Sequence, residues 1–363
     1  MYLLRKLRFG SKSIVCYLSF LLIMKNYLIV IATASILLSC SESKESRLQN
    51  FLLKGNIAVK ENHFEQGAYY YAEAIKLEPC FADALNNLGT IYFNQEKWEN
   101  ALKQYNKAIE CKPDFLNAYF NRANTYYEMK EYYSASRDLE KVITAKPDTA
   151  IAYFTRGLIS TKLREYDKAL IAFDKAIQLD GEKTEYLVNR ATVKFYERRF
   201  DESKAELLSV LKKDTLESNI YNTLSMIETE LKNYNQALTW VNKALTLSPD
   251  EPYFLNNRGY IYLSLNDLAK AEEDINKSIG LDPYNGWAYR NKGIYYLLKQ
   301  DHASSERLLS QALKMDPFID KVHFYYGMAL INTGKPMEAC EQFNLSEEAD
   351  DKMLTVDLIK KCK

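Results

Sequence analysis

Proline recurs along this chain at a fixed spacing, and that spacing restricts what the chain can fold into. Successive members of the set lie 34 residues or a multiple of 34 residues apart: Pro79, Pro113, Pro147, Pro249, Pro283 and Pro317. The two positions without proline hold Gly181 and Thr215. A repeat of this length predicts a stack of similar supersecondary units, each packed mainly against its neighbours.

Small residues recur at two other positions of the repeat, and a large residue recurs at a third. A small residue, needed where two helices approach closely, recurs at Gly55, Gly89, Ala123, Gly157, Ala191, Ser225, Gly259, Gly293 and Gly327. Twelve residues later a second small position follows at Gly67, Ala101, Ala135, Ala169, Ser203, Ala237, Ala271, Ser305 and Ala339. A large residue precedes it by three places at Phe64, Trp98, Tyr132, Tyr166, Phe200, Tyr234 and Leu268. Apolar residues between these positions recur every three to four residues, which predicts helices.

With these positions in phase, residues 48–353 resemble the tetratricopeptide-repeat family. The resemblance implies an all-α, right-handed solenoid of nine helix–turn–helix units, each made of two antiparallel helices. In the second unit we expect helices at 82–95 and 98–111, with proline ending the second helix of each unit. The tail, residues 354–363, fits the polar capping helix that terminal repeats require.

One stretch departs from the pattern. Between residues 181 and 230, Ser203 stands where most units have alanine, and Lys194 and Glu228 stand where other units have tyrosine. Because coupling between adjacent units sets local stability in such arrays, we predict a softer or differently curved joint here.

Residues 1–39 form a different kind of sequence. A basic start at Lys25 is followed by an apolar run from Tyr27 to Leu38, which has the length of a secretory signal and is shorter than a spanning helix. We therefore predict that translation begins at Met24. The ending Leu37-Leu38-Ser39-Cys40 resembles the lipobox of bacterial lipoproteins, which implies cleavage before Cys40 and its acylation.

Residues 40–47 are then a lipidated cysteine and a short polar tether, which places the protein in a bacterial cell envelope, with the outer membrane favoured. An uncleaved anchor, with Cys40 an ordinary cysteine, is the alternative.

Charge and motifs restrict the function. Lys plus Arg and Asp plus Glu both number 48, and this balance argues against a nucleic-acid partner, which normally meets a basic face. The three histidines have no cysteine or aspartate at ligand or triad spacing, and no hydrolase or phosphate-loop motif occurs. We therefore predict a non-enzymatic protein without catalytic residues, metal or cofactor.

The resemblance also implies a concave groove, lined by the first helix of each unit, that binds extended peptides or partner helices. Its recurring asparagine corresponds here to Asn87, Asn121, Asn189, Asn257 and Asn291. Side-chain amides can pair with a peptide backbone, although asparagines that are merely solvated remain the alternative. Neighbouring groove positions with residue types suited to binding are Tyr127, Tyr253, Tyr260, Trp287 and Arg290.

Four cysteines fall in two candidate pairs. Cys80 and Cys111 lie at the ends of second helices in adjacent units, and Cys340 and Cys362 fall in the last unit and the tail. In an exported protein either pair is a possible disulfide, while free thiols remain the alternative for each.

These features favour an envelope-anchored scaffold that binds protein partners, as in lipoproteins that assist assembly of an outer-membrane or secretion complex. The alternative is a component of surface glycan or nutrient uptake. The strict spacing disfavours it, because such proteins add long irregular loops to their repeats. The oligomeric state and the identity of the partner are not indicated by the sequence.

Overall fold

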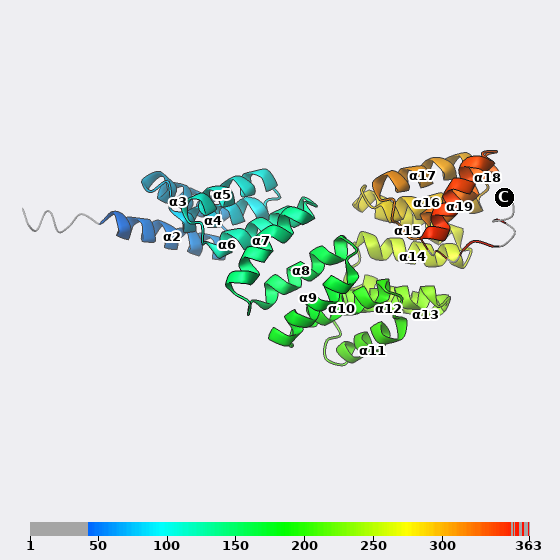
Figure 1. Cartoon of the computed structure of the whole chain (residues 1–363), viewed down its shortest axis with the longest axis horizontal. Coiled ribbons are helices and arrows are strands. Elements are labelled where there is room, and N and C mark those ends of the chain that lie inside the picture. Colours follow the sequence, from blue (N-terminus) through cyan, green and yellow to red (C-terminus); the bar gives the residue numbers. More distant parts are fainter. Residues whose placement is uncertain (1–42, 350, 352, 356–357, 359–361, 363) are drawn as a thin grey trace, which may run out of the picture. The chain divides into compact units, whose positions relative to one another are not determined.

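The computed structural model describes residues 43–363, except residues 350, 352, 356–357, 359–361 and 363 (Figure 1). The predicted signal region, the start at Met24 and the lipidated Cys40 lie outside the described residues. Where the chain is described, its regular structure is entirely helical, and 18 helices follow one another in nine pairs. The predicted all-α array of helix–turn–helix units is therefore confirmed.

The chain divides into two compact units, Met1–Pro147 and Asp148–Lys363. The first unit holds three helix pairs, drawn in blue to blue-green in Figure 1: α2 (Lys44–Lys60) with α3 (Phe64–Leu77), α4 (Ala82–Asn94) with α5 (Trp98–Cys111), and α6 (Leu116–Glu128) with α7 (Tyr132–Ala145). The expected bounds of the second pair agree with α4 and α5 to within one residue.

The second unit holds the other six pairs, drawn in green to red. These are α8 (Ala150–Lys162) with α9 (Tyr166–Leu179), α10 (Thr184–Tyr196) with α11 (Phe200–Leu211), α12 (Ser218–Glu230) with α13 (Tyr234–Leu247), α14 (Pro252–Ser264) with α15 (Leu268–Leu281), α16 (Gly286–Leu298) with α17 (His302–Met315), and α18 (Val322–Asn332) with α19 (Pro336–Glu348).

The turn inside each pair has the same backbone geometry. The second residue after the first helix adopts a left-handed conformation, with φ between 58° and 77°. In chain order these residues are Asn62, Glu96, Lys130, Arg164, Arg198, Lys232, Asn266, Gln300 and Gly334. A left-handed residue after the helix end satisfies the last carbonyl groups and reverses the chain. Only one of the nine is glycine, so the packing of the two helices holds this turn against the preference of the side chain.

The two helices of a pair touch where a small residue faces a large one. A Cβ atom added to Gly157 would lie 2.5 Å from the Phe173 ring, and one added to Gly89 would lie 2.6 Å from the Tyr105 ring. Where this position is alanine, as at Ala191, the residue 16 places later is smaller, and there it is a leucine. Glycine at this position faces either an aromatic ring or an aliphatic side chain, as at Gly259 with Ile275 and Gly293 with Leu309, and close packing is kept in each case.

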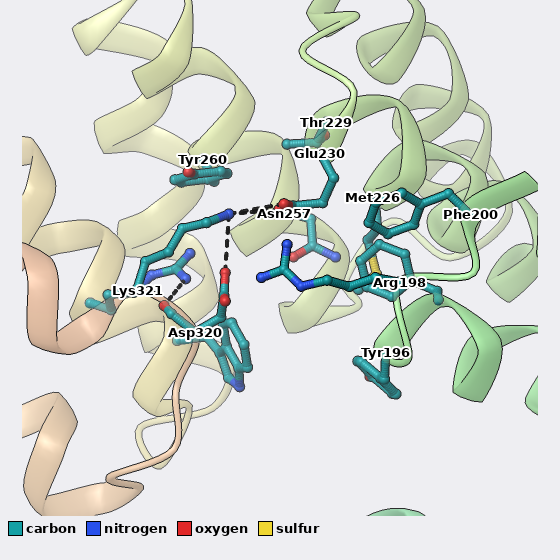
Figure 2. Close-up of a pocket in the computed structure, with 13 residues that line it drawn as sticks. Tyr196, Arg198, Phe200, Met226, Thr229, Glu230, Asn257, Tyr260, Asp320 and Lys321 are labelled. Atoms are coloured by element: carbon teal, nitrogen blue, oxygen red, sulfur yellow. Dashed lines mark hydrogen bonds and ion pairs between the residues drawn. The ribbon is translucent and has the colours of Figure 1, made fainter. Parts of the chain in front are cut away.

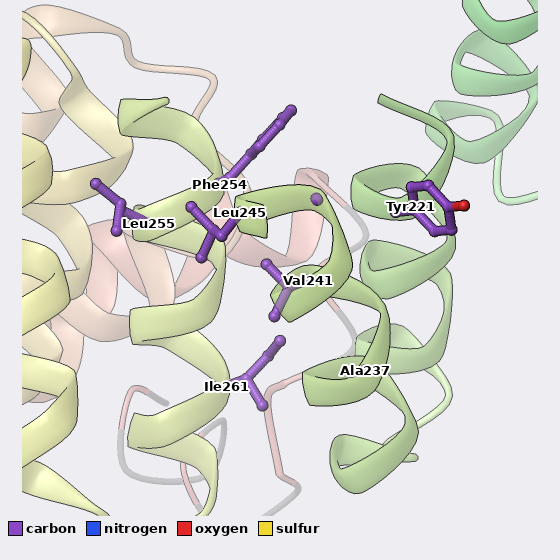
Figure 3. Packing of buried hydrophobic residues seen from close by; sticks show 8 residues of the cluster. Tyr221, Ala237, Val241, Leu245, Phe254, Leu255 and Ile261 are labelled. Carbon is purple, nitrogen blue, oxygen red and sulfur yellow. The ribbon is translucent and has the colours of Figure 1, made fainter. Parts of the chain in front are cut away.

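The core of the second unit is continuous from pair to pair. Figure 3 shows one cluster, in which Val241 and Leu245 of α13 pack with Phe254, Leu255 and Ile261 of α14. All five are buried, and full burial of each such side chain contributes about 1.5–3 kcal/mol. The apolar faces predicted from the three-and-four spacing thus form the contacts between units.

In several units one arginine side chain forms hydrogen bonds with two neighbouring helices. In α14, Nε and Nη2 of Arg258 donate to both carboxylate oxygens of Asp274 on α15, at 2.6 and 2.8 Å. Its Nη1 donates to Asn242 on the preceding α13, at 2.9 Å. Arg122 and Arg190 make equivalent contacts on both sides.

The stretch that departs from the repeat pattern has polar contacts in place of apolar ones. Lys194 donates to Glu206 at 2.7 Å, and Lys204 donates to Glu228 at 2.6 Å. The Ser203 hydroxyl donates to the carbonyl oxygen of Ala191 at 2.7 Å, across the closest approach of α10 and α11. At 12 residues, α11 is two residues shorter than each of the other second helices from α3 to α17. The softer joint at 181–230 stays a prediction.

The end of the chain packs on the last pair. Leu354, Leu358 and Cys362 contact the cluster formed by Leu330, Ala339 and Phe343. Most of the capping helix predicted for residues 354–363 lies outside the described residues. In the part of the chain that is described, no helix combines the length and the apolar character needed to cross a bilayer.

Candidate functional site

A pocket of about 130 Å³ opens in the second unit, on the side formed by the first helices of successive pairs (Figure 2). The residues that line it come from α10, α12, α14, α16 and the segments next to them: Phe195, Tyr196, Arg198, Phe200, Met226, Thr229, Glu230, Asn257, Tyr260, Trp287, Arg290, Asp320 and Lys321. Because five consecutive pairs contribute, no single repeat contains the site.

An ion pair between distant pairs closes one side of the pocket. Lys321 Nζ donates to the two carboxylate oxygens of Glu230 at 2.8 and 3.1 Å, and it lies 3.1 Å from Asp320. The Lys321 side chain is only 9% exposed. Burial alone would lower the pKa of Lys321, but the two carboxylates more than offset it, and the pKa is raised. Lys321 is therefore charged at neutral pH.

The backbone before α18 breaks the repeat geometry. In the other units that have proline at the boundary, the first helix begins three residues after it, as Gly286 follows Pro283; Val322 begins α18 five residues after Pro317. Lys321 has φ 59°, the one left-handed residue among those described that falls outside the periodic turn series. A lysine in this conformation is strained, and such strain concentrates at functional sites.

Arg290 forms the floor of the pocket beside this segment. Its Nε and Nη2 donate to the amide oxygen of Asn291 at 3.0 and 2.7 Å, and its Nη1 donates to the backbone carbonyl of Asp320 at 2.7 Å. The guanidinium carbon lies 4.9 Å from the ring centre of Tyr260 and 5.0 Å from that of Trp287. These contacts fix the plane of the guanidinium group.

Tyr260 and Tyr325 of α18 pack against the same apolar cluster, and their phenol groups influence one another. Burial raises the pKa of Tyr260, which the neighbouring Arg290 cation partly opposes. Burial also raises the pKa of Tyr325. Both phenols are therefore neutral hydrogen-bonding groups at neutral pH.

The pocket brings together four of the residues predicted from sequence: Asn257, Tyr260, Trp287 and Arg290. Three further candidates in the same unit, Asn189, Tyr253 and Asn291, are not among the residues that line the pocket. Asn189 donates to the Glu185 carbonyl oxygen of its own helix at 2.9 Å, and Tyr253 at the start of α14 is 47% exposed.

Three predicted groove residues belong to the first unit. Asn87 donates to Asn56 at 3.0 Å, and Asn121 donates to Asn86 at 2.9 Å. The Tyr127 ring packs at a tilt against Tyr132, and burial, followed by the nearby Tyr132 and Glu128, raises the pKa of Tyr127 to about 12. These side chains face their neighbouring helices as well as the surface.

The recurring asparagine therefore acts chiefly between helices. Asn257 donates to the amide oxygen of Asn222 at 2.9 Å, and Asn291 donates to that of Asn256 at 2.7 Å, in each case one repeat away. Asn291 is 0% exposed, and its amide joins α14 to α16 and holds Arg290. A contact between Asn291 and a groove ligand stays a prediction.

The sequence does not indicate the other residues that line the pocket beside Asn257, Tyr260, Trp287 and Arg290. Glu230, Asp320 and Lys321 are ordinary charged residues in the sequence, and contact between α12 and the segment before α18 depends on the curvature of the stack. Arg198 and Met226 face the pocket for the same reason (Figure 2). No local pattern marks them.

The four candidate cysteines form two disulfides in the structure, Cys80–Cys111 and Cys340–Cys362, with Cα separations of 5.2 and 5.3 Å. The first joins the ends of α3 and α5, and the second joins α19 to the end of the chain. Among the described residues, no group of three or more His, Cys, Asp or Glu side chains is placed to hold a metal ion.

Several family models match successive residue ranges of the chain. Models described as tetratricopeptide repeat match residues 70–103, 150–183 and, for a third model, 116–149, 218–251 and 252–285; one described as TPR repeat matches 89–130. Together they match about half of the chain and leave out residues 184–217, within the stretch that departs from the pattern. A search of curated proteins found no match.

Solved structures give a similar result. The Cut9–Hcn1 hetero-tetramer of the APC/C aligns with a TM-score of 0.60 at 17% identity, covering 89% of this chain and 64% of that one. PilF of Pseudomonas aeruginosa aligns with a TM-score of 0.50 at 17% identity, covering 57% and 95%. YrrB, titled a TPR protein with an unusual peptide-binding site, aligns with a TM-score of 0.42 at 23% identity, covering 51% and 95%. At such identities these likenesses concern the fold alone.

Proposed function

Because the chain belongs to the tetratricopeptide-repeat family, we propose that it is a non-enzymatic scaffold that binds a segment of a protein partner in the pocket of its second unit. Repeats of this family are protein–protein interaction modules. The observation that carries the proposal is the convergence of Asn257, Tyr260, Trp287 and Arg290 on one concave pocket. Tryptophan, tyrosine and arginine are the residue types most enriched at binding hot spots.

We further propose that the scaffold is held in a bacterial envelope by acylation of Cys40. Support comes from the apolar run that ends at this cysteine and from the two disulfides, which persist in oxidising compartments. Because α2 begins at Lys44, only residues 41–43 separate Cys40 from the first helix, and this short tether would keep the repeats near the membrane, since three extended residues reach only about 10 Å. The outer membrane and a role in assembling an envelope complex are the form of this proposal that we favour.

The binding proposal is tested by affinity capture from envelope extract. The bait is the soluble chain starting at Ser41, compared with the double variant Asn257→Ala/Trp287→Ala. The matched control is Asn189→Ala/Tyr253→Ala, which alters two groove candidates outside the pocket. A partner captured by the wild type and the control, and lost by the pocket variant, supports the proposal; equal capture by all three would place the site elsewhere.

The anchoring proposal is tested separately. Cys40→Ser should move the full-length protein from the membrane fraction to the soluble fraction, and metabolic labelling with a fatty acid should mark the wild type only. Labelling of both proteins, or of neither, would contradict acylation at Cys40.

A further inference from the structure

Arg290 is a buried cation without an anionic partner. Its residue is 4% exposed, yet the three hydrogen bonds of its guanidinium go to the amide oxygen of Asn291 and the backbone carbonyl of Asp320, both neutral. No carboxylate among the described residues forms an ion pair with it. Burial of a charge is costly unless an opposite charge accompanies it.

Other arginines of the repeat array, unlike Arg290, are paired with a carboxylate. Arg122 and Arg258 each face an aspartate, Asp138 and Asp274, which accepts from Nε and Nη2 together. Arg290 has the same fork directed at an amide oxygen. Its positive charge is therefore left for something outside the described chain.

The unused donors of Arg290 are held in position. A guanidinium carries five N–H groups, and the contacts above use three of them. Tyr260 and Trp287 flank the group at 4.9 and 5.0 Å, which fixes its plane before any ligand arrives. Rigid, pre-oriented forks of this kind favour the planar carboxylate group as a ligand.

The remaining charges of the pocket do not compensate Arg290. The carboxylates of Glu230 and Asp320 both lie against Lys321. Both carboxylates therefore contact the Lys321 cation, and neither forms an ion pair with Arg290. The opposite wall is apolar, with Phe195, Phe200 and Met226.

From this combination we propose that the pocket recognises an acidic side chain of the partner segment, an aspartate or glutamate that pairs with Arg290, next to an apolar side chain that packs against Phe200 and Met226. This inference rests on the proposed function and specifies the chemistry of the partner. A peptide, and not a small free anion, is the occupant, because the apolar wall needs a second side chain to cover it.

The test first selects peptides that bind the protein and then replaces the carboxylate of the best binder by the corresponding amide. A random heptapeptide library displayed on phage is panned against the soluble chain starting at Ser41. The most enriched sequence is synthesised with a fluorescent label, together with its counterpart in which Glu or Asp is replaced by Gln or Asn. Affinities for the wild-type protein are measured by fluorescence anisotropy, so that no protein variant is needed for the main comparison.

We expect enrichment of an acidic residue beside an aromatic or aliphatic one, and a loss of about tenfold or more in affinity for the amide counterpart, as for a charge-assisted hydrogen bond. Arg290→Met should abolish the difference between the two peptides, whereas the charge-matched control Lys277→Met, on the exposed side of α15, should retain it. Circular dichroism establishes that both variants are folded. Free succinate should compete only weakly.

Three outcomes would overturn the inference: no enriched peptide, enriched peptides without an acidic residue, or equal affinity for the acid and its amide. Strong competition by succinate would also overturn it in favour of a small-anion site. Peptides that bind the pocket without preferring an acid leave the proposed scaffold function intact. Equal capture by all three baits in the affinity experiment above would instead contradict the proposed function of the pocket itself.

Discussion

Lys321 Nζ lies 2.8 Å from Glu230 Oε1, although the two residues are 91 positions apart in the chain. Glu230 is the last residue of α12, and Lys321 precedes α18. The contact therefore spans three repeats across the concave side of the second unit. It positions the Asp320 carbonyl that holds Arg290, and it does so with a lysine in a left-handed backbone conformation.

Replacing either partner of this ion pair should destabilise the second unit, but by different amounts. Lys321→Met removes the partner of both Glu230 and Asp320 and should lower the free energy of unfolding by about 1–3 kcal/mol, less than a fully buried pair because Glu230 is 22% exposed. Glu230→Gln should cost less, because Asp320 still neutralises Lys321. Urea unfolding of both variants measures the difference, and the reverse order would show that Asp320 contributes nothing.

Gly157→Ala should destabilise the first pair of the second unit. Alanine favours a helix over glycine by about 1 kcal/mol, but its Cβ would lie 2.5 Å from the Phe173 ring, and such overpacking costs about 1–3 kcal/mol. The double variant Gly157→Ala/Phe173→Leu reproduces the pair found at Ala191 and Leu207 and should recover part of the loss. Thermal unfolding measures both variants. A double variant less stable than Gly157→Ala alone would contradict the argument that the clash with the Phe173 ring causes the loss.

Glu228 should make stability fall in acid. Burial of its carboxylate opposes ionisation, but hydrogen bonds from Lys204 and Asn233 more than offset burial, and the pKa of Glu228 is lowered from its ordinary 4.5. A lowered pKa in the folded state contributes stability above pH 4.5 that is lost as pH falls through the folded pKa. We expect the melting temperature of Glu228→Gln to depend less on pH between 5 and 3 than that of the wild type. Parallel curves would show that this carboxylate does not contribute.

Under the proposed envelope location, both disulfides should be formed in the native protein. The form starting at Ser41 retains four cysteines, and thiol titration in denaturant should find none reactive before reduction and four after it. Cys80→Ser/Cys111→Ser should lower stability by about 2–4 kcal/mol, because the bond closes a loop between residues 31 positions apart. Four reactive thiols without reductant, in protein purified from the envelope, would contradict the pairing.

The sequence predicts the helix pairs well because the information is local. Proline, the small residue and the large residue recur in phase, and each determines where a helix ends or where two helices touch. The bounds of α4 and α5 follow directly. The start of α18 does not, because Asp320 and Lys321 are held by Arg290 of the neighbouring α16 and by Glu230 of α12, three repeats away.

The candidate site is predictable only in part, for the same reason. Tyr260, Trp287 and Arg290 stand out by residue type and repeat position. The contacts of the recurring asparagine are not indicated by the sequence, because a side-chain amide that can pair with a peptide backbone pairs equally well with an amide of the next repeat. Asn291 shows this most clearly. Glu230 becomes part of the site only through the curvature of the stack.

The central claim is that this pocket contacts a protein partner, and photo-crosslinking in cells tests it most directly. A benzophenone amino acid is introduced at Asn257 in the pocket or, as a matched control, at Ile171 on the exposed surface of α9, which is 70% exposed. We predict a discrete crosslinked partner from position 257 and none from position 171, with the band at 257 lost in the Arg290→Met background. Crosslinks from position 171 alone, or no crosslink from 257, would contradict the account.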